Sequence, residues 1–400
     1  MSSEKIVDLL KVQGFRASGV SCGIKKNGKR DLALILSDVP ARVASLFTTN
    51  KVKAAPVLID MERVKKGGIR GVIVNSGNAN ACTGKKGYSD ALKMTALAEK
   101  ALGLDKGSIL VSSTGVIGVP LPVEKVEAGM KDLIEGLSYD GLPDAGEAIM
   151  TTDAFMKTAS ASAVIGGRKV TIAGIAKGAG MICPNMATML AYFVTDCDVP
   201  VAALRKALKE ATDLSFNSII VDNDTSTNDT SMIFANGLAG NRPARYGTPE
   251  YQRFVRLLTE VSTRLAHMIV KDGEGATRFI EIKIKRAASD KDARLAGRTM
   301  AESFLVKTAF FGGDPNWGRI MAAIGKAAIK MDESKTDIIF NGVHVVKNGL
   351  DTGMEKEAAA AIKVREVVVT VDLRMGKGTS TIWTTDLSYE YVKINSAYRT

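Results

Sequence analysis

The chain has 400 residues, of which 46% are hydrophobic and 24% are charged. A chain of this length can bury large cores, so we expect two domains or one large composite unit. No apolar run approaches the roughly 18 residues that span a bilayer, and the first ten residues do not form a signal sequence. These features predict a cytoplasmic protein that does not enter a membrane.

The formal net charge of +11 raises the possibility of a non-catalytic nucleic-acid-binding protein. The basic residues occur in twos and threes along the whole chain, without interleaved aromatic residues or a known binding module. A solvated basic surface is the favoured interpretation, and no nucleic-acid partner is expected. Four scattered cysteines, Cys22, Cys82, Cys183 and Cys197, offer neither a disulfide framework nor metal-binding spacing, so we expect reduced thiols.

The first half of the chain mixes strand and helix patterns. Short apolar runs between turn residues predict strands at 32–36, 57–59, 72–74 and 109–118, the last running into a glycine-containing turn. Alanine and leucine at helical spacing predict a helix over 88–103 that ends at Gly103. Weaker patterns predict helices over 122–136 and 144–157.

The second half begins with a strand-like pattern from 159 to 195, interrupted at 177–188 by glycines and a proline. Residues 250–270 form the clearest amphipathic helix. The tail reads as mostly β, because valines recur at period two over 367–373 and Asn341-Gly342 predicts a hairpin turn. Without a regular βαβ rhythm, these blocks indicate an α+β layered architecture.

Familiar catalytic motifs are weak in this chain. Residues 19–23 match the GxSxG pattern, but the following residues predict a turn instead of the helix that a nucleophile elbow requires. His267 lies among apolar residues of a helix and His344 lies in a hairpin strand, so neither is a good catalytic base.

Cofactor and metal motifs are weak as well. Residues 178–180 lack the rest of a phosphate-binding fingerprint, and the acidic run 222–230 lacks EF-hand spacing and reads as a hydrogen-bonded turn network. We therefore expect neither a nucleotide cofactor nor a metal.

A free N-terminal threonine would activate a nucleophile without histidine, cysteine or metal. Its hydroxyl can pass a proton to its own α-amine, whose ordinary pKa is roughly 8. Thr188 follows the small Ala187 and a turn rich in glycine and proline, and it opens a predicted strand. Attack of its hydroxyl on the Ala187 carbonyl would give an ester that water can cut. Most Ala-Thr dipeptides are structural, so this reading alone is weak.

Ordered sequence blocks strengthen this reading. The segment KGAGMICPNMATMLAYFVTD (177–196) resembles the self-cleavage signature of the glutamate N-acetyltransferase family of arginine biosynthesis, also called the ornithine acetyltransferase family. Similar blocks occur at 74–84, 112–118, 151–157, 215–230, 271–279, 312–320 and the terminal INSAYRT. They extend from residue 74 to residue 400, and only about the first seventy residues carry little signature.

The resemblance implies a layered α/β/β/α sandwich with sheets between helices. It also implies cleavage into an α chain, 1–187, and a β chain, 188–400, with two of each associating. Thr188 would carry acetyl in a ping-pong transfer from N-acetylornithine to glutamate without a cofactor. Acetyl-CoA as a second donor stays open.

The resemblance also assigns site residues. Thr114 and Gly115 would form the oxyanion hole. Substrate binding maps onto Thr151, Lys177, Thr188, Glu274, Asn395 and Thr400. Three alternatives remain: Thr152 in place of Thr151, Cys183 as a rival nucleophile, and a related N-terminal-nucleophile amidohydrolase or aminopeptidase in which water replaces glutamate.

Overall fold

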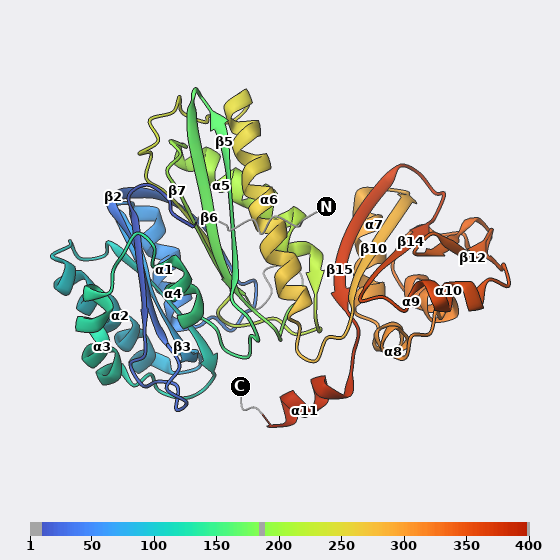
Figure 1. Cartoon of the computed structure of the whole chain (residues 1–400), viewed down its shortest axis with the longest axis horizontal. Coiled ribbons are helices and arrows are strands. Elements are labelled where there is room, and N and C mark those ends of the chain that lie inside the picture. Colours follow the sequence, from blue (N-terminus) through green and yellow to red (C-terminus); the bar gives the residue numbers. More distant parts are fainter. Residues whose placement is uncertain (1–9, 184–188, 398–400) are drawn as a thin grey trace, which may run out of the picture.

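The computed structural model describes residues 10–183 and 189–397. These residues build two lobes side by side (Figure 1). The larger lobe contains an eight-stranded sheet and the smaller lobe contains a seven-stranded sheet. The last helix, α11 (Tyr389–Ala397), leaves the smaller lobe and runs back toward the larger one.

The eight-stranded sheet folds over on itself through its second strand. The first half of β2 (Leu32–Phe47) pairs with β1 and β3, and its second half pairs with β9. One half of the sheet is therefore β1-β2-β3-β4 and the other is β2-β9-β7-β6-β5. The other strands are β1 (Phe15–Val20), β3 (Ile69–Asn78), β4 (Ile109–Val116), β5 (Lys157–Ile165), β6 (Arg168–Lys177), β7 (Leu190–Thr195) and β9 (Thr230–Ala235).

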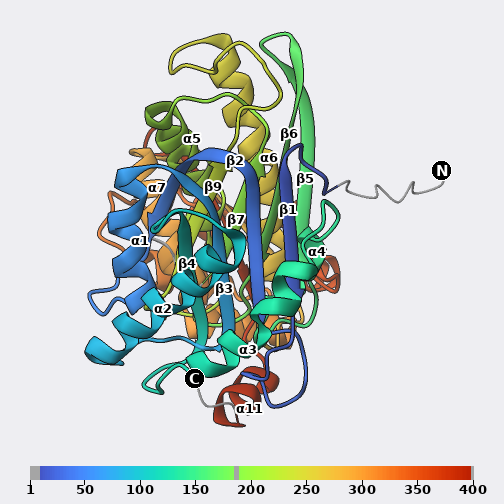
Figure 2. The same ribbon diagram turned by 90° about the vertical axis from the view of Figure 1, so that its left-hand side faces the viewer.

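The two halves of the sheet stack face to face between helices. Alternation along β2 shows this, because Leu32 and Leu34 pack with the outer helices while Ala33 and Ile35 pack with Tyr192 of β7 in the inner core. One outer layer contains α1 (Ala55–Lys66), α2 (Gly84–Leu102) and α3 (Val123–Glu135), which face the viewer in Figure 2. The other contains α5 (Val201–Leu214) and α6 (Pro249–Lys271), and α4 (Leu142–Ala148) contributes to the inner core. These layers confirm the α/β/β/α sandwich.

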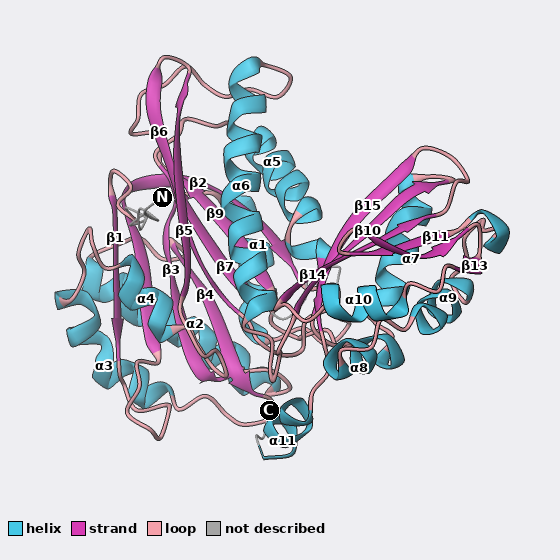
Figure 3. Cartoon of the chain, turned by 45° about the vertical axis from the view of Figure 1, so that its right-hand side comes forward, coloured by secondary structure: helices cyan, strands magenta, loops and turns pink. Residues whose placement is uncertain are grey.

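The smaller lobe is a second α+β unit with its own core (Figure 3). Its strand order is β13-β12-β11-β14-β10-β15-β8. Its strands are β8 (Ile219–Ile220), β10 (Phe279–Ala287), β11 (Asp337–Phe340), β12 (Val343–Lys347), β13 (Leu350–Asp351), β14 (Glu366–Asp372) and β15 (Gly378–Thr385); its helices are α7 (Asp290–Ala301), α8 (Phe304–Gly312), α9 (Trp317–Gly325) and α10 (Glu355–Ala361). Strand β8 follows α5 and pairs with β15, which ties the two lobes together.

Most of the local predictions are confirmed. The helices expected at 88–103, 122–136 and 250–270 are α2, α3 and α6, and Gly103 has the left-handed φ of +64° that suits a helix end. The hairpin at Asn341-Gly342 joins β11 to β12.

Three local predictions are wrong. The run 57–59 lies inside α1, because a short apolar run cannot distinguish a strand from one turn of a buried helix. The helix expected over 144–157 ends at Ala148, and the residues after it form the turn that leads into β5. The tail is not mostly β, because α7, α8, α9 and α10 pack on its sheet.

The predicted chain boundary between Ala187 and Thr188 lies outside the described residues. On its two sides, β6 and β7 are antiparallel neighbours, with Lys177 opposite Leu190. Any product of a cut there would keep these strands interleaved in one sheet. No helix in 10–183 or 189–397 is long and apolar enough to cross a membrane.

Candidate active site

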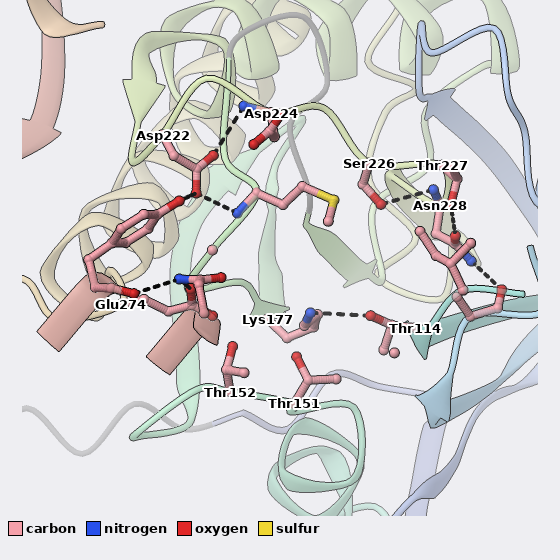
Figure 4. A pocket seen from close by; sticks show the side chains of 17 residues that line it. Thr114, Thr151, Thr152, Lys177, Asp222, Asp224, Ser226, Thr227, Asn228 and Glu274 are labelled. Atoms are coloured by element: carbon pink, nitrogen blue, oxygen red, sulfur yellow. Dashed lines mark hydrogen bonds between the residues drawn. The ribbon is translucent and has the colours of Figure 1, made fainter. Parts of the chain in front are cut away.

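A cavity of about 190 Å³ opens beside the carboxyl ends of β4 and β6, where segments distant in sequence meet. Figure 4 shows the side chains around it. Seven residues that the sequence analysis named line this cavity: Thr114, Gly115, Thr151, Thr152, Lys177, Glu274 and Asn395. The other three, Ala187, Thr188 and Thr400, lie outside the described residues.

Gly115 gives the cavity a close turn of backbone. Its φ of +132° is a conformation that side chains disfavour. A β-carbon at this position would lie 2.4 Å from the carbonyl carbon of Gly77 and 2.5 Å from the nitrogen of Asn78 on β3. The end of β4 is held further by Asn228, whose Nδ2 donates to the carbonyl of Ser113 at 2.8 Å. The predicted oxyanion donors therefore lie on a fixed strand end.

Lys177 contacts the first of these predicted donors. Lys177 is the last residue of β6 and is only 4% exposed. Its Nζ donates a hydrogen bond to Oγ1 of Thr114 at 3.2 Å. Burial lowers the pKa of Lys177, while the charge of Asp153 opposes that shift and the charge of Lys157 adds to it. The cavity thus contains a buried cation next to a hydroxyl.

A buried ion group lies behind Lys177. Nζ of Lys157 contacts Asp153 at 2.6 Å and Asp272 at 2.5 Å. Asp153 also accepts from the N–H of Thr151 at 2.9 Å and from the N–H of Gly178 at 2.8 Å. This network ties the Thr151 turn to the end of β6, so Thr151 and Lys177 have fixed relative positions.

Glu274 lies at another side of the cavity, after the end of α6. Its N–H donates to the carbonyl of Ala179 at 2.9 Å, and Nδ2 of Asn395 donates to its Oε2 at 2.8 Å. Gly180 allows this approach, because a β-carbon there would lie 2.4 Å from Oε2 of Glu274. Asn395 belongs to α11, so the last helix contributes to the cavity wall.

The polar run 222–230 forms a cavity wall that the sequence analysis did not recognise as part of the site. Asp222, Asp224, Ser226, Thr227 and Asn228 all line the cavity. Asp222 accepts from the N–H of Met181 at 2.7 Å, from the N–H of Asp224 at 3.2 Å and from the hydroxyl of Tyr391 at 3.2 Å. Burial raises the pKa of Asp222 to about 6.

The contacts within this wall decide between the two interpretations of the run 222–230, a cation loop or a hydrogen-bonded turn network. The predicted hydrogen-bonded turn network is confirmed by these contacts. The density of Asp, Asn, Ser and Thr within nine residues was a signal of a polar wall. Their use in the site became visible only through the contacts of this loop with β4, Met181 and α11.

The rival sites do not gain support from the geometry. The GxSxG serine, Ser21, is exposed in an irregular segment after β1, not between a strand and a helix. The ring of His267 packs 4.5 Å from that of Trp383, and His344 is exposed on β12. Burial raises the pKa of Cys183 to about 11, which disfavours its thiolate. Within 10–183 and 189–397, no group of three or more His, Cys, Asp or Glu side chains could hold a metal.

Comparison with known proteins decides the family. The model described as the ArgJ family matches residues 16–400. The chain belongs to the ArgJ family. The arginine biosynthesis bifunctional protein ArgJ of Geobacter sulfurreducens is 52% identical over 393 residues, which are 98% of this chain and 100% of that protein. The ArgJ protein of Symbiobacterium thermophilum is 50% identical over 390 residues, 97% of each chain.

One solved structure matches part of the chain. The arginine biosynthesis bifunctional protein from Bacillus halodurans is 38% identical, with a TM-score of 0.49, and the match covers 51% of this chain and 96% of that chain. Membership of the ArgJ family confirms the resemblance seen in the sequence blocks. The chain is thus an acyltransferase of arginine biosynthesis, and the amidohydrolase alternative is not favoured.

Proposed function

We propose that this ArgJ chain is a glutamate N-acetyltransferase that moves acetyl from N-acetylornithine to glutamate through an acetyl ester on Thr188. One observation carries the proposal: seven named residues from widely separated segments line a single cavity in a chain that matches ArgJ proteins from end to end. Thr188 enters this proposal through its place in the chain between β6 and β7: Lys177 at the end of β6 lines the cavity, and Leu190 at the start of β7 pairs with Lys177.

The nucleophile would be made by self-cleavage. The hydroxyl oxygen of Thr188 attacks the carbonyl carbon of Ala187, the peptide C–N bond breaks, and the hydroxyl proton goes to the departing nitrogen. This shift frees the α-amine of Thr188, and water then hydrolyses the ester, which releases the carboxylate of Ala187 and the hydroxyl of Thr188. The α chain, 1–187, and the β chain, 188–400, would stay together because β5 and β6 pair within the same sheet as β7 and β9.

Acetyl transfer would follow in two balanced steps. The hydroxyl of Thr188 gives its proton to its own α-amine and attacks the acetyl carbonyl of N-acetylornithine. The acetyl C–N bond breaks, the proton passes to the leaving nitrogen, and ornithine departs. In the second step the α-amine of glutamate attacks the acetyl ester, the C–O bond breaks, and Thr188 regains its proton.

Thr114 and Gly115 would stabilise the oxyanion of each tetrahedral intermediate. Lys177 can only donate hydrogen bonds, so the hydroxyl of Thr114 accepts from it and keeps its own hydrogen for the developing charge. The backbone N–H of Gly115 is the second donor. Preorganised donors of this kind are worth about 3 kcal/mol each.

The charges around the cavity suit a ligand with both a carboxylate and an ammonium group. Lys177 supplies the cation, while Glu274, Asp222 and Asp224 supply acids. In Figure 4 the three acids lie on the side away from Thr114. We assign the substrate carboxylate to Lys177 with help from Thr151, and the ornithine side-chain ammonium to Glu274, supported by Asn395 and Thr400.

Several wider features belong to the same proposal. The exchange needs no cofactor, because the acetyl group is held on the protein. The relatives are named bifunctional, which supports a second donor that we take to be acetyl-CoA. Two α and two β chains would form the working enzyme in the cytoplasm.

A single-turnover experiment tests the reaction. Enzyme is loaded with labelled acetyl from N-acetylornithine, freed of ornithine, and divided between buffer with and without glutamate. The transferase releases N-acetylglutamate only where glutamate is present, and acetyl stays on the protein elsewhere. Release of acetate at the same rate in both samples would instead indicate an amidohydrolase.

A further inference from the structure

Asp229 is a buried carboxyl beside the active-site cavity that the reaction above does not use. It directly follows Asn228 of the cavity wall and is 1% exposed. Its Oδ1 accepts a hydrogen bond from the N–H of Met189 at 3.1 Å. Met189 is the residue that follows Thr188 in the chain, so Asp229 contacts the backbone next to the proposed nucleophile.

The backbone on both sides of this contact is fixed. The carbonyl of Asp229 accepts from the N–H of Thr48 at 2.9 Å, and the N–H of Thr230 donates to the carbonyl of Met189 at 3.1 Å. Strands β7 and β9 then continue as parallel neighbours from Leu190 opposite Thr230. The carboxyl group of Asp229 therefore has a defined place relative to the start of β7.

The second oxygen of this carboxyl group is buried as well and has room for a further hydrogen bond. Oδ2 of Asp229 accepts no hydrogen bond of ordinary geometry among the residues that the structure describes, although the side chain and the backbone N–H of Ser226 lie beside this carboxyl group. A buried polar atom without a well-formed hydrogen bond is unfavourable, so native proteins keep such atoms where a function or a further ligand accounts for them. Burial also raises the pKa of Asp229 well above its usual range, against the opposing charge of Lys177.

The contact with Met189 indicates which group could donate to Oδ2. The nitrogen of Met189 belongs to the planar peptide group that joins residues 188 and 189, whose α-carbons lie about 3.8 Å apart across a trans bond. Along the chain, the nitrogen of Thr188 comes one residue before the nitrogen of Met189, which Asp229 holds. Before cleavage that nitrogen is an amide, and afterwards it is an amine with additional N–H donors.

We propose that Asp229 is a positioning residue for self-cleavage and acetyl transfer: Oδ1 holds the peptide group between residues 188 and 189, and Oδ2 accepts from the amine that cleavage frees on Thr188. The inference rests on the proposed function of Thr188. Fixing the amine keeps it directed at the hydroxyl of the same residue, which must pass its proton to that nitrogen in both reactions.

Asp229→Asn tests this role, and Asp60→Asn is its matched control. Asp60 is also 1% exposed and also accepts from a backbone N–H, that of Val111, at 3.0 and 3.2 Å, but it does not line the cavity. Both substitutions keep an oxygen that can accept from the backbone. Only Asp229→Asn replaces the second carboxyl oxygen beside Met189, an acceptor, by an amide NH2 group, which donates.

Cleavage is followed by denaturing mass spectrometry, and kinetics are measured on the cleaved fraction after folding is verified by thermal unfolding. Asp229→Asn should be cut more slowly than wild type, with kcat about 10–100-fold lower and KM for N-acetylornithine within about twofold. Asp60→Asn should be cut completely and keep the wild-type kcat, even if it melts earlier. If Asp229→Asn does not fold, Asp229→Glu, which moves the carboxyl by one methylene, is expected to show the same loss of kcat.

Two results separate this inference from the proposed function. A wild-type chain that stays intact while active would contradict the proposed function of Thr188. A cleaved wild type together with an Asp229 variant that is cut and turns over at the wild-type rate would overturn only the role of Asp229. Equal losses of kcat in the Asp229 and Asp60 variants would likewise show that Asp229 has only a structural role.

Discussion

Nζ of Lys177 lies 3.2 Å from Oγ1 of Thr114, and this hydrogen bond joins the end of β6 to the end of β4. An ammonium group has donors only, so it fixes the direction in which the Thr114 hydroxyl can donate. A residue assigned to substrate binding thereby orients a residue assigned to the oxyanion hole.

Replacing Thr114 by valine keeps the shape of the side chain and removes the hydroxyl. If that hydroxyl stabilises the oxyanion, kcat should fall by about 10²-fold with little change in KM, because the loss appears only in the transition state. Steady-state kinetics with N-acetylornithine and glutamate measure this. Thr171→Val is the control, since that hydroxyl contacts Ser162 on the β5–β6 hairpin. Equal kcat values for both variants would contradict the assignment.

Glu274→Gln tests the recognition of the ornithine ammonium. Glutamine can still accept from Asn395, but it carries no charge to pair with the ligand. We expect KM for N-acetylornithine to rise about 10–100-fold, as for loss of one partner of a charge pair, with a smaller change in kcat. Glu366→Gln, which removes an exposed partner of Lys271, should leave both constants unchanged. An unaltered KM in the Glu274 variant would rule out this role.

Lys157→Met should destabilise the fold strongly. Lys157 is completely buried between Asp153 and Asp272, so its removal leaves two buried carboxylates without their cation. Breaking a buried ion pair in this way costs about 3–5 kcal/mol of unfolding free energy. Urea denaturation measures the loss. Lys93→Met removes an exposed ion pair with Glu127 and should leave the midpoint unchanged; similar midpoints for the two variants would refute the prediction.

Asp222 should make stability depend on pH in a defined window. Burial raises its pKa in the folded protein to about 6, whereas an unfolded aspartate has a pKa of about 4. Between these values the folded state binds the extra proton, so the contribution of Asp222 to stability is present at low pH and decreases as pH rises to about 6.

Asp222→Asn removes this titration. The unfolding free energy of wild type minus that of the variant should therefore decrease by on the order of 2 kcal/mol between pH 4 and pH 7. Chemical denaturation of both proteins at several pH values gives this difference. Parallel stability curves would show that Asp222 titrates normally.

The sequence predicted more of the site than of the fold around it. Lys177, Glu274 and Asn395 were found because family-like blocks surround them, and all three line the cavity. Asp222 also lies in a family-like block, 215–230, but the resemblance assigned it no role and its run was interpreted as a hydrogen-bonded turn network. Its contacts with Met181 and Tyr391 join segments about 40 and 170 residues away, and no local pattern contains that information.

The same limit applies to the fold. Periodicity located α2, α3 and α6, because one apolar face of a helix is a local property. It did not reveal that β2 takes part in both halves of the sandwich, since strand pairing depends on partners such as β3 and β9 that lie far along the chain. In the smaller lobe α8 was missed for a different reason: it is apolar on several sides and has little periodic contrast.

Denaturing mass spectrometry of active wild-type protein is the most direct test of the central claim. The account predicts two fragments, one beginning at Met1 and one beginning at Thr188, and a transient acetyl adduct on the second fragment after incubation with N-acetylornithine. Thr188→Ala should remain a single uncut chain without activity. An intact 400-residue chain in fully active protein, or an acetyl adduct on another residue, would contradict it.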